Sequence, residues 1–454
     1  MPFNLSKNLI INTLFSFIPI SFIAGNLIIN LNILLFILLS LIFYGKQIIK
    51  IKLLFLDKLI LAFFSYLILV ALYKNVYQEY FLASSEDLTV IIKTMLYLRF
   101  LILYFIIRYL VKFELLNFKI FFITCGLITA FLIFDLIFQY IFGYDIFGFE
   151  GRPRRMSGPF GEELIAGSYL QRFSIFSFFI IPIFFKKFET KNYKFYKAIF
   201  FGFLFFALIV AGNRIPLLFF TVMFFFLIIF EKEFKKYLIG FLFLVISIFT
   251  ISYNVSEEFD DHYQVFQEEV FAIITSIGPN NNYDHLKKFK NEKKRERVKQ
   301  RYTAQIGDKK IPLVNVYAKD LYSGYQTWKI QKFVGGGVKS YKKSCAKSAM
   351  INCGPHPHNY YLDILANIGL FGFLILLFIF LTLFYLSFIK RYFIKSKNHT
   401  NMLITPFIFL FFTEIFPIKT SGSFFTTGNS TYIFLILSIL AALSTSEKFK
   451  LKQK

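Results

Sequence analysis

Long apolar runs separated by short polar turns fill most of the chain. Asn26–Tyr44 and Phe195–Val210 are two of these runs. About 20 apolar residues in a helix cross a hydrocarbon core of roughly 30 Å, so the pattern predicts about 12 membrane-spanning helices. The predicted spans lie near residues 8–25, 27–45, 53–73, 88–111, 117–143, 162–185, 195–212, 214–230, 236–254, 360–388, 402–417 and 430–445.

One polar stretch between the ninth and tenth predicted spans divides the chain into three parts. Residues 1–254 carry the spans before it, residues 255–357 form one large loop, and residues 358–454 carry the remaining spans. Composition agrees, because 56% of the 454 residues are hydrophobic and only 17% are charged, which excludes a soluble domain. The expected fold class is an all-α integral membrane protein with one large loop outside the bilayer.

The formal net charge of +24 raises the question of a nucleic-acid partner. The turns after even-numbered spans and the two chain ends carry most of the lysines, whereas the opposite short loops carry few basic residues. Lys and Arg gather on the cytoplasmic side of membrane proteins, so both termini are predicted to be cytoplasmic and the large loop periplasmic. Topology explains the charge, and no nucleic acid is expected. The opposite short loops hold Lys74, Arg152, Arg154, Arg155, Arg214 and Lys419.

The two halves of the large loop differ in pattern. His285–Arg301 has almost no apolar face and is predicted to be a solvated helix or a mobile loop. Leu321, Tyr325 and Trp328 follow at i, i+4 and i+7, which predicts an amphipathic helix packed through that stripe and ended by the glycines at 335–337.

Two of the three cysteines, Cys345 and Cys353, lie eight positions apart in the large loop. A periplasmic loop is in an oxidising compartment, so these residues form either a disulfide or two thiols. No Cys/His set has the spacing of a structural zinc site. We therefore expect no metal and no other cofactor.

The segment PHPHNYYLDILANIGLFG, residues 355–372, joins the large loop to the tenth span. His358 and Asn359 are followed after nine residues by Gly369 and then by Gly372. This spacing at the outer mouth of a late span resembles the family of O-antigen ligases and Wzy-type polymerases. Further stretches resemble that family in the same order: Gly151–Tyr169, Ala211–Arg214, Val334–Lys339 and Pro417–Phe425. One position departs, since Gly324 stands where the family often has Arg, and Lys329 or Lys332 would have to substitute.

The resemblance implies a GT-C-like enzyme of the bacterial inner membrane that needs no metal. Its donor would be an undecaprenyl-diphosphate-linked glycan, and its acceptor lipid A-core for a ligase or a growing glycan for a polymerase. Both remain open, as does a transporter of the same lipid-linked sugar. A transporter should show two similar halves with broken helices, and the sequence shows neither. Membrane lipids are the other expected partners.

The same resemblance implies roles for individual residues. His358 would accept the proton of the attacking hydroxyl, as imidazole suits near neutral pH. The alternative is an interfacial His at the start of the tenth span, with Asn359 as helix cap. The catalytic role for His358 is favoured, with Asn359 contacting substrate.

Arginine suits a diphosphate because its planar fork binds two oxygens. Arg214 lies between two apolar runs, either facing phosphate or snorkelling to the interface. Among the loop arginines Arg155 is favoured, three residues before Gly158, and Arg152 is the second choice. Gly369 and Gly372 are expected to let two helices pack closely. The charged residues inside spans are expected to pair with one another, and contact with substrate is the alternative: Lys93, Arg99, Asp135 and Arg172.

Overall fold

The computed structural model describes most of the membrane part of the chain and half of the large loop. The described residues are 6–81, 88–152, 155–230, 250, 303–306, 309–312, 316–347, 353–394, 402–419 and 422–445. The predicted span 236–254, apart from Thr250, lies outside them, as do Arg154 and the predicted solvated segment His285–Arg301.

Helices make up nearly all of the described structure. The first part of the chain contains α1 (Lys7–Ile23), α2 (Asn26–Ile49), α3 (Phe55–Phe81), α4 (Thr89–Tyr97), α5 (Arg99–Lys112), α6 (Phe118–Phe142), η1 (Gly158–Phe160), α7 (Ala166–Phe173), η2 (Ser174–Phe179), α8 (Ile180–Phe184), η3 (Lys186–Phe188), α9 (Lys191–Val210) and α10 (Arg214–Phe230). The second part contains β1 (Thr303–Ile306), β2 (Lys309–Pro312), α14 (Val316–Ile330), α15 (Tyr341–Lys347), α16 (Tyr360–Phe384), the π-helix η5 (Tyr385–Ile394), α17 (Thr405–Glu414) and α18 (Thr427–Thr445).

Within the described residues, seven helical stretches are long and apolar enough to cross a membrane. They are Asn26–Ile49, Phe55–Asn75, Thr89–Lys112, Phe118–Phe142, Ala166–Phe184, Tyr360–Phe393 and Thr427–Thr445. Shorter apolar helices cover four further predicted spans: Lys7–Ile23, Phe195–Val210, Arg214–Phe230 and Thr405–Glu414. The chain is therefore a multi-pass membrane protein, and the total of about 12 spans stays a prediction.

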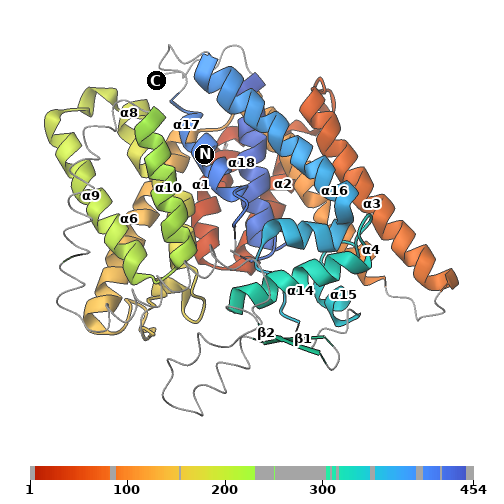
Figure 1. Ribbon diagram of the computed structural model, residues 1–454. Coiled ribbons are helices and arrows are strands. Elements are labelled where there is room, and N and C mark those ends of the chain that lie inside the picture. Colours follow the sequence, from red (N-terminus) through yellow and green to blue (C-terminus); the bar gives the residue numbers. More distant parts are fainter. Residues whose placement is uncertain are drawn as a thin grey trace, which may run out of the picture.

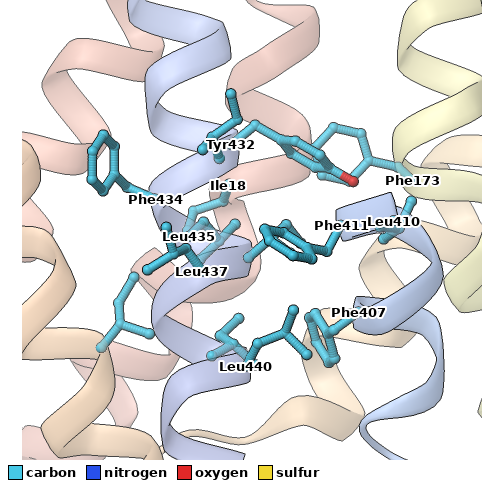
Figure 2. Packing of buried hydrophobic residues seen from close by; sticks show 14 of the residues in the cluster. Ile18, Phe173, Phe407, Leu410, Phe411, Tyr432, Phe434, Leu435, Leu437 and Leu440 are labelled. Carbon is cyan, nitrogen blue, oxygen red and sulfur yellow. The ribbon is translucent and has the colours of Figure 1, made fainter. Parts of the chain in front are cut away.

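The helix α18 lies in the middle of the bundle (Figure 1). In its apolar window 78% of the residues are buried, against 33% in α2, so α18 is the central helix and α2 a peripheral one. Figure 2 shows how its side chains meet those of α1, α7 and α17 in an apolar core. Phe434 of α18 also stacks on Phe100 of α5, with ring centroids 5.7 Å apart. Aromatic stacking of this kind adds to packing where lipid tails give no hydrophobic drive between helices.

A small polar cap covers one end of the bundle (Figure 1). It contains α14, α15 and an antiparallel hairpin in which Thr303 pairs with Pro312 and Ile306 with Lys309. The described residues bear out the all-α fold class, and this short hairpin within the large predicted loop is an addition to it.

The predicted amphipathic helix is present as α14, but its packing face differs from the predicted stripe, of which Leu321 and Trp328 are half-buried. Tyr325 is 40% exposed, whereas the buried face consists of Ser323, Gly324 and Thr327. The Ser323 hydroxyl lies 2.6 Å from that of Tyr341 in α15, and Gly324 packs against Leu362 of α16. Only small side chains fit here, because α14 lies close to α15 and α16. A prediction from hydrophobicity alone therefore placed the packing face on the larger apolar residues.

The helix α16 is broken at Gly369, and the loop after α14 fills the break. Gly369 has φ 68° and ψ −175°, a backbone region that only glycine adopts readily. The backbone N–H groups of Gly336 and Gly337 donate to the carbonyls of Ala366 and Asn367, at 3.2 and 2.6 Å. In return, the N–H groups of Leu370 and Phe371 donate to the carbonyls of Lys332 and Phe333, at 2.8 and 3.1 Å.

This exchange satisfies the backbone groups that the break exposes. A Cβ on Gly369 would lie 2.3 Å from the carbonyl oxygen of Phe333, so Gly369 accommodates the loop and not a second helix, which corrects the prediction. Gly372 does lie against a helix, since its Cβ would meet the Tyr66 ring of α3 at 2.7 Å. The cap is thus fixed to the helix that begins just after His358.

Candidate functional site

A pocket of about 440 Å³ lies where several predicted outer turns meet. Its walls come from the α1–α2 turn, the segment 155–169 before and within α7, the α9–α10 turn, His358, and the segment 422–429 at the start of α18. All of these turns follow odd-numbered predicted spans. Its Arg, Glu and His lining residues are Arg155, Glu163, Arg172, Arg214 and His358.

His358 occupies the last turn of chain before α16 and has an unusual backbone. Its φ is 51°, in the left-handed region that costs a non-glycine residue about 1 kcal/mol or more. Its side chain is 35% exposed, and its Nε2 lies 3.8 Å from Oδ2 of Asp320 in α14. That separation is too long for a hydrogen bond, so the carboxylate acts on the imidazole by charge.

Two neighbours of His358 have shifted pKa values. Burial raises the pKa of Asp320, and the charge of His358 opposes that rise. The ring of His356 lies 4.3 Å from that of His358 between centroids, and burial followed by His358 lowers the pKa of His356 to about 4. At neutral pH His356 is therefore uncharged and is no competitor for the proton that His358 would carry.

Asn359 caps α16 and does not line the pocket. Its Oδ1 accepts hydrogen bonds from the N–H groups of Tyr361 and Leu362, at 3.0 and 3.1 Å. Its Nδ2 donates to the carbonyl of Pro417 at 2.8 Å. These contacts give Asn359 the helix-capping role that the sequence offered as the alternative, because its amide fixes the backbone beside His358. A contact between Asn359 and substrate stays a prediction.

The predicted arginines separate into two groups. Arg155 and Arg214 line the pocket with His358. Arg152 does not line it and forms an exposed ion pair with Glu162. The backbones of Arg152 and Arg155 pair with each other across a tight turn, so their side chains start from opposite ends of one small loop.

Asn213 explains how Arg214 is placed. The Asn213 side chain accepts a hydrogen bond from the N–H of Gly167 at 2.9 Å and donates to the carbonyl of Leu164 at 2.8 Å. Gly167 must lack a side chain, because a Cβ there would lie 2.7 Å from that of Asn213. The α9–α10 turn is thereby fastened to the start of α7, and Arg214 begins α10 at the pocket wall.

Arg172 is a pocket residue whose role the sequence did not reveal. It is buried, and its Nε and Nη2 donate to the two carboxylate oxygens of Glu414 in α17, at 2.9 and 3.1 Å. Nη2 also donates to Oδ1 of Asn429 at 2.7 Å, and Lys419 forms a second ion pair with Glu414 at 2.8 Å. A buried charge group with this many contacts fixes three elements around the pocket.

The expectation that Lys93, Arg99, Asp135 and Arg172 pair with one another is wrong. Arg172 pairs with Glu414, Asp135 accepts from the N–H of Ile146 at 2.9 Å, and the two other cations contact the polar cap and α18. The sequence did contain one sign of this pair. Glu414 is an acid inside an apolar run and so needs a buried cation, but it lies far from Arg172 in the sequence.

A disulfide joins Cys345 of α15 to Cys353, with their Cα atoms 6.0 Å apart. It ties the polar cap to the segment that leads into His358. The structure also accounts for Gly324, because a Cβ there would lie 2.6 Å from that of Pro357. Lys329 and Lys332, the suggested substitutes for the family's arginine, are exposed and do not line the pocket.

Among the described residues, no group of three or more His, Cys, Asp or Glu side chains could hold a metal ion. The absence of a metal or other cofactor in the reaction stays an expectation. What the pocket does offer is a titratable imidazole and several guanidinium groups around one space, which suits an anionic substrate that takes part in proton transfer.

A family model described as O-antigen ligase matches residues 199–377. The matched region runs from α9 into α16 and contains Arg214, both bridged cysteines, His358, Asn359 and the two glycines of the motif. Arg155 and Arg172 lie before it. No curated protein matches the chain.

Proposed function

We propose that this chain, whose residues 199–377 belong to the O-antigen ligase family, transfers a glycan from a lipid diphosphate carrier to a sugar hydroxyl at the outer face of the bacterial inner membrane. The observation that carries the proposal is the pocket. His358, Arg155 and Arg214 come from three distant segments and line one space. A lipid-linked donor can place its headgroup there while its tail stays in the bilayer.

The donor is a glycan linked to undecaprenyl diphosphate, and the undecaprenyl diphosphate leaves as the new bond forms. The acceptor oxygen attacks the anomeric carbon, the bond from that carbon to the phosphate oxygen breaks, and the diphosphate departs with the electron pair. Arg155 and Arg214 meet its growing negative charge with paired N–H donors. Neither arginine needs a metal ion for this contribution.

His358 takes the proton that the acceptor hydroxyl loses in the same step. The Asp320 carboxylate, 3.8 Å away, then faces an imidazolium and stabilises it by charge. Asn359 and the disulfide hold the backbone on the two sides of this histidine. Arg172 is engaged by Glu414 and acts as a fixed positive charge in the pocket wall.

The acceptor we propose is lipid A-core, which makes the enzyme a ligase. Deletion of the gene followed by glycolipid analysis tests this. Unmodified core together with carrier-linked polymer supports the ligase. Core capped by single repeats identifies a polymerase, and accumulation of carrier-linked units on the cytoplasmic side identifies a transporter.

The chemical step has its own test in a transfer assay with purified protein. His358→Ala should lower the transfer rate by about 10²–10⁴-fold, because a general base contributes that much. Binding of the diphosphate lipid, measured separately, should stay within about twofold of the wild type. Wild-type transfer by His358→Ala would overturn the catalytic assignment.

A further inference from the structure

Three cations gather outside the pocket, on the other side of the start of α18. Lys93 belongs to α4, Arg99 begins α5, and Lys339 lies in the loop between α14 and α15. The Nζ of Lys93 donates to the carbonyl of Lys339 at 3.3 Å, and the Nη2 of Arg99 donates to Oγ1 of Thr427 at 3.3 Å. None of the three lines the pocket.

These positive charges lie close enough to oppose one another. Burial, then the charges of Arg99 and Lys93, lower the pKa of Lys339. Within the part of the chain that the structure describes, no ion pair joins any of the three to an acid. Like charges held together in this way are destabilising unless an anion joins them.

The backbone conformation of Lys339 is also strained. Its φ of 57° is in the left-handed region, which a lysine rarely adopts. The next two N–H groups, of Ser340 and Tyr341, both donate to Oδ1 of Asn367 in α16, at 2.7 and 3.0 Å. The strained turn is thus anchored to α16, and it holds the exposed Lys339 next to Lys93, whose ammonium contacts the Lys339 carbonyl.

The start of α18 adds to the positive field. Thr427 is the first residue of this 19-residue helix, and the N-terminus of a helix carries about half a positive charge. Its neighbours Thr426 and Gly428 line the pocket, whereas Thr427 contacts Arg99. One helix start therefore separates the pocket from the cation cluster.

The surroundings of the cluster are apolar and exposed. Ile92, Met95 and Leu96 of α4 are 54%, 51% and 61% exposed, and they flank Lys93 on the same helix. A helix face of this kind in a membrane protein contacts lipid chains. A ligand that reaches the three cations is therefore one with an anionic headgroup and acyl chains.

We propose that Lys93, Arg99 and Lys339 form a second anion site, which binds the phosphate of a lipid headgroup next to the catalytic pocket. We assign that phosphate to the acceptor glycolipid, a step that rests on the proposed function. Bound there, the glycolipid would keep its chains against α4 and extend its sugars across the start of α18 toward His358.

The test is a native mass spectrometry titration of the detergent-purified full chain. The probes are a glycolipid with one phosphomonoester and the same glycolipid after phosphatase treatment. The variants are Lys339→Gly, Arg99→Gln and the double variant Lys93→Gln/Arg99→Gln. Glycine adopts the φ of Lys339 without strain, so Lys339→Gly removes the charge while the turn keeps its shape.

The phosphorylated glycolipid should bind about fivefold more weakly for each cation removed, and about 25-fold more weakly to the double variant. The dephosphorylated form should bind all proteins equally. Lys329→Gln, which removes an exposed lysine of α14 that stacks on Tyr325, is the matched control and should change nothing. Equal binding of the two glycolipids by the wild type, or unchanged binding by the variants, overturns the site.

Competition with phosphatidylglycerol separates the two sources of lipid phosphate. If a large excess leaves the phosphorylated glycolipid bound, the site is selective for the glycolipid acceptor. If equal amounts displace it, the site takes any anionic phospholipid and the assignment to the acceptor fails. His358→Ala should bind the glycolipid normally. Absence of transfer by the wild type would therefore refute the proposed function, whereas this binding result would still stand.

Discussion

At the residue scale, two arginines of one pocket differ in what surrounds them. Arg172 donates hydrogen bonds from Nε and Nη2 to the Glu414 carboxylate, and its Nη2 also donates to Asn429 and Tyr360. Arg214 stands at the first residue of α10, fixed by the contacts of Asn213. The first fits a supporting role in the wall, and the second fits contact with the donor diphosphate.

Arg214→Ala should weaken binding of the diphosphate lipid as well as turnover. A hydrogen bond to a charged group contributes about 1.5–3 kcal/mol, so the affinity should fall about 10- to 100-fold. Arg214→Lys should recover only part of it, since a point charge replaces a two-pronged donor. The measurement is lipid binding to purified variants, and normal binding by Arg214→Ala would return this arginine to an interfacial snorkelling role.

The shifted pKa of His356 predicts how the stability of the folded protein changes at acidic pH. Its folded-state pKa is about 4, below its ordinary value, because burial and His358 disfavour its charged form. As the pH falls from about 6.5 to 4, the unfolded chain binds a proton at His356 that the folded chain does not, so the folded state loses stability in that window.

His356→Gln removes this proton linkage. The unfolding midpoint of the variant should therefore fall less than that of the wild type between pH 7 and pH 4.5. The midpoints of both proteins at pH 7 serve as the control. Thermal unfolding in detergent at both pH values measures the difference. An identical fall for both proteins would show that His356 does not contribute.

At the element scale, the break in α16 joins the polar cap to the membrane part. Four backbone hydrogen bonds cross it, two in each direction. The break at Gly369 and the cap at Asn359 fix the two ends of the first segment of α16, which carries Asp363 and Asn367 into the packing around the pocket. Asp363 accepts from the Ser423 hydroxyl at 2.6 Å and the Phe424 N–H at 2.9 Å, so it also orders the segment before α18.

Gly369→Ala and Gly372→Ala form a matched pair. Alanine at 369 must adopt backbone angles that only glycine adopts readily, and its Cβ would lie 2.3 Å from the Phe333 carbonyl oxygen. The substitution should therefore lower the free energy of unfolding by about 3 kcal/mol or more. Alanine at 372 keeps a helical backbone and meets side-chain atoms of Ile368 and Tyr66 at 2.7–2.8 Å but no backbone, so it should lower the free energy of unfolding less, by about 1–2 kcal/mol.

Unfolding midpoints of the two variants in detergent, together with their transfer rates, check this order. Gly369→Ala should also lose transfer activity, because the cap that carries Asp320 is fastened through this break. Equal effects of the two substitutions would mean that the loop contact at Gly369 contributes nothing beyond close packing.

At the scale of the whole molecule, the pocket agrees with the charge-based orientation. Its walls are turns that follow odd-numbered predicted spans, which the distribution of lysines assigns to the outer side. The polar cap lies at one end of the bundle (Figure 1), and its Asp320 lies 3.8 Å from the pocket residue His358. A donor whose glycan has already crossed the membrane can reach such a pocket.

Orientation is tested by cysteine labelling from outside the cell in a Cys125→Ala background. A cysteine in place of Lys329, exposed on α14, should react with an impermeant reagent, and one in place of Lys187, exposed after α8, should not. Lysed cells serve as the control, in which both should react. The reverse pattern would overturn the orientation and the outer location of the pocket.

The sequence by itself determined the local features of this protein. Apolar runs long enough to cross a bilayer forced helices, because a lipid-exposed backbone must satisfy its own hydrogen bonds. The apolar helices of the described part coincide with predicted spans. The order of short motifs around His358 and Arg214 also pointed to the family whose model matches residues 199–377.

Only the tertiary structure decided which distant residues meet. The pairing of Arg172 with Glu414 joins positions 242 residues apart, and no periodicity reports such a contact. The buried face of α14 has small polar side chains because it lies against α16. Gly369 accommodates the loop after α14, because that loop packs into the break in α16. Local patterns record which groups prefer lipid or water, whereas partners across the bundle are chosen by packing and by the need to pair every buried charge.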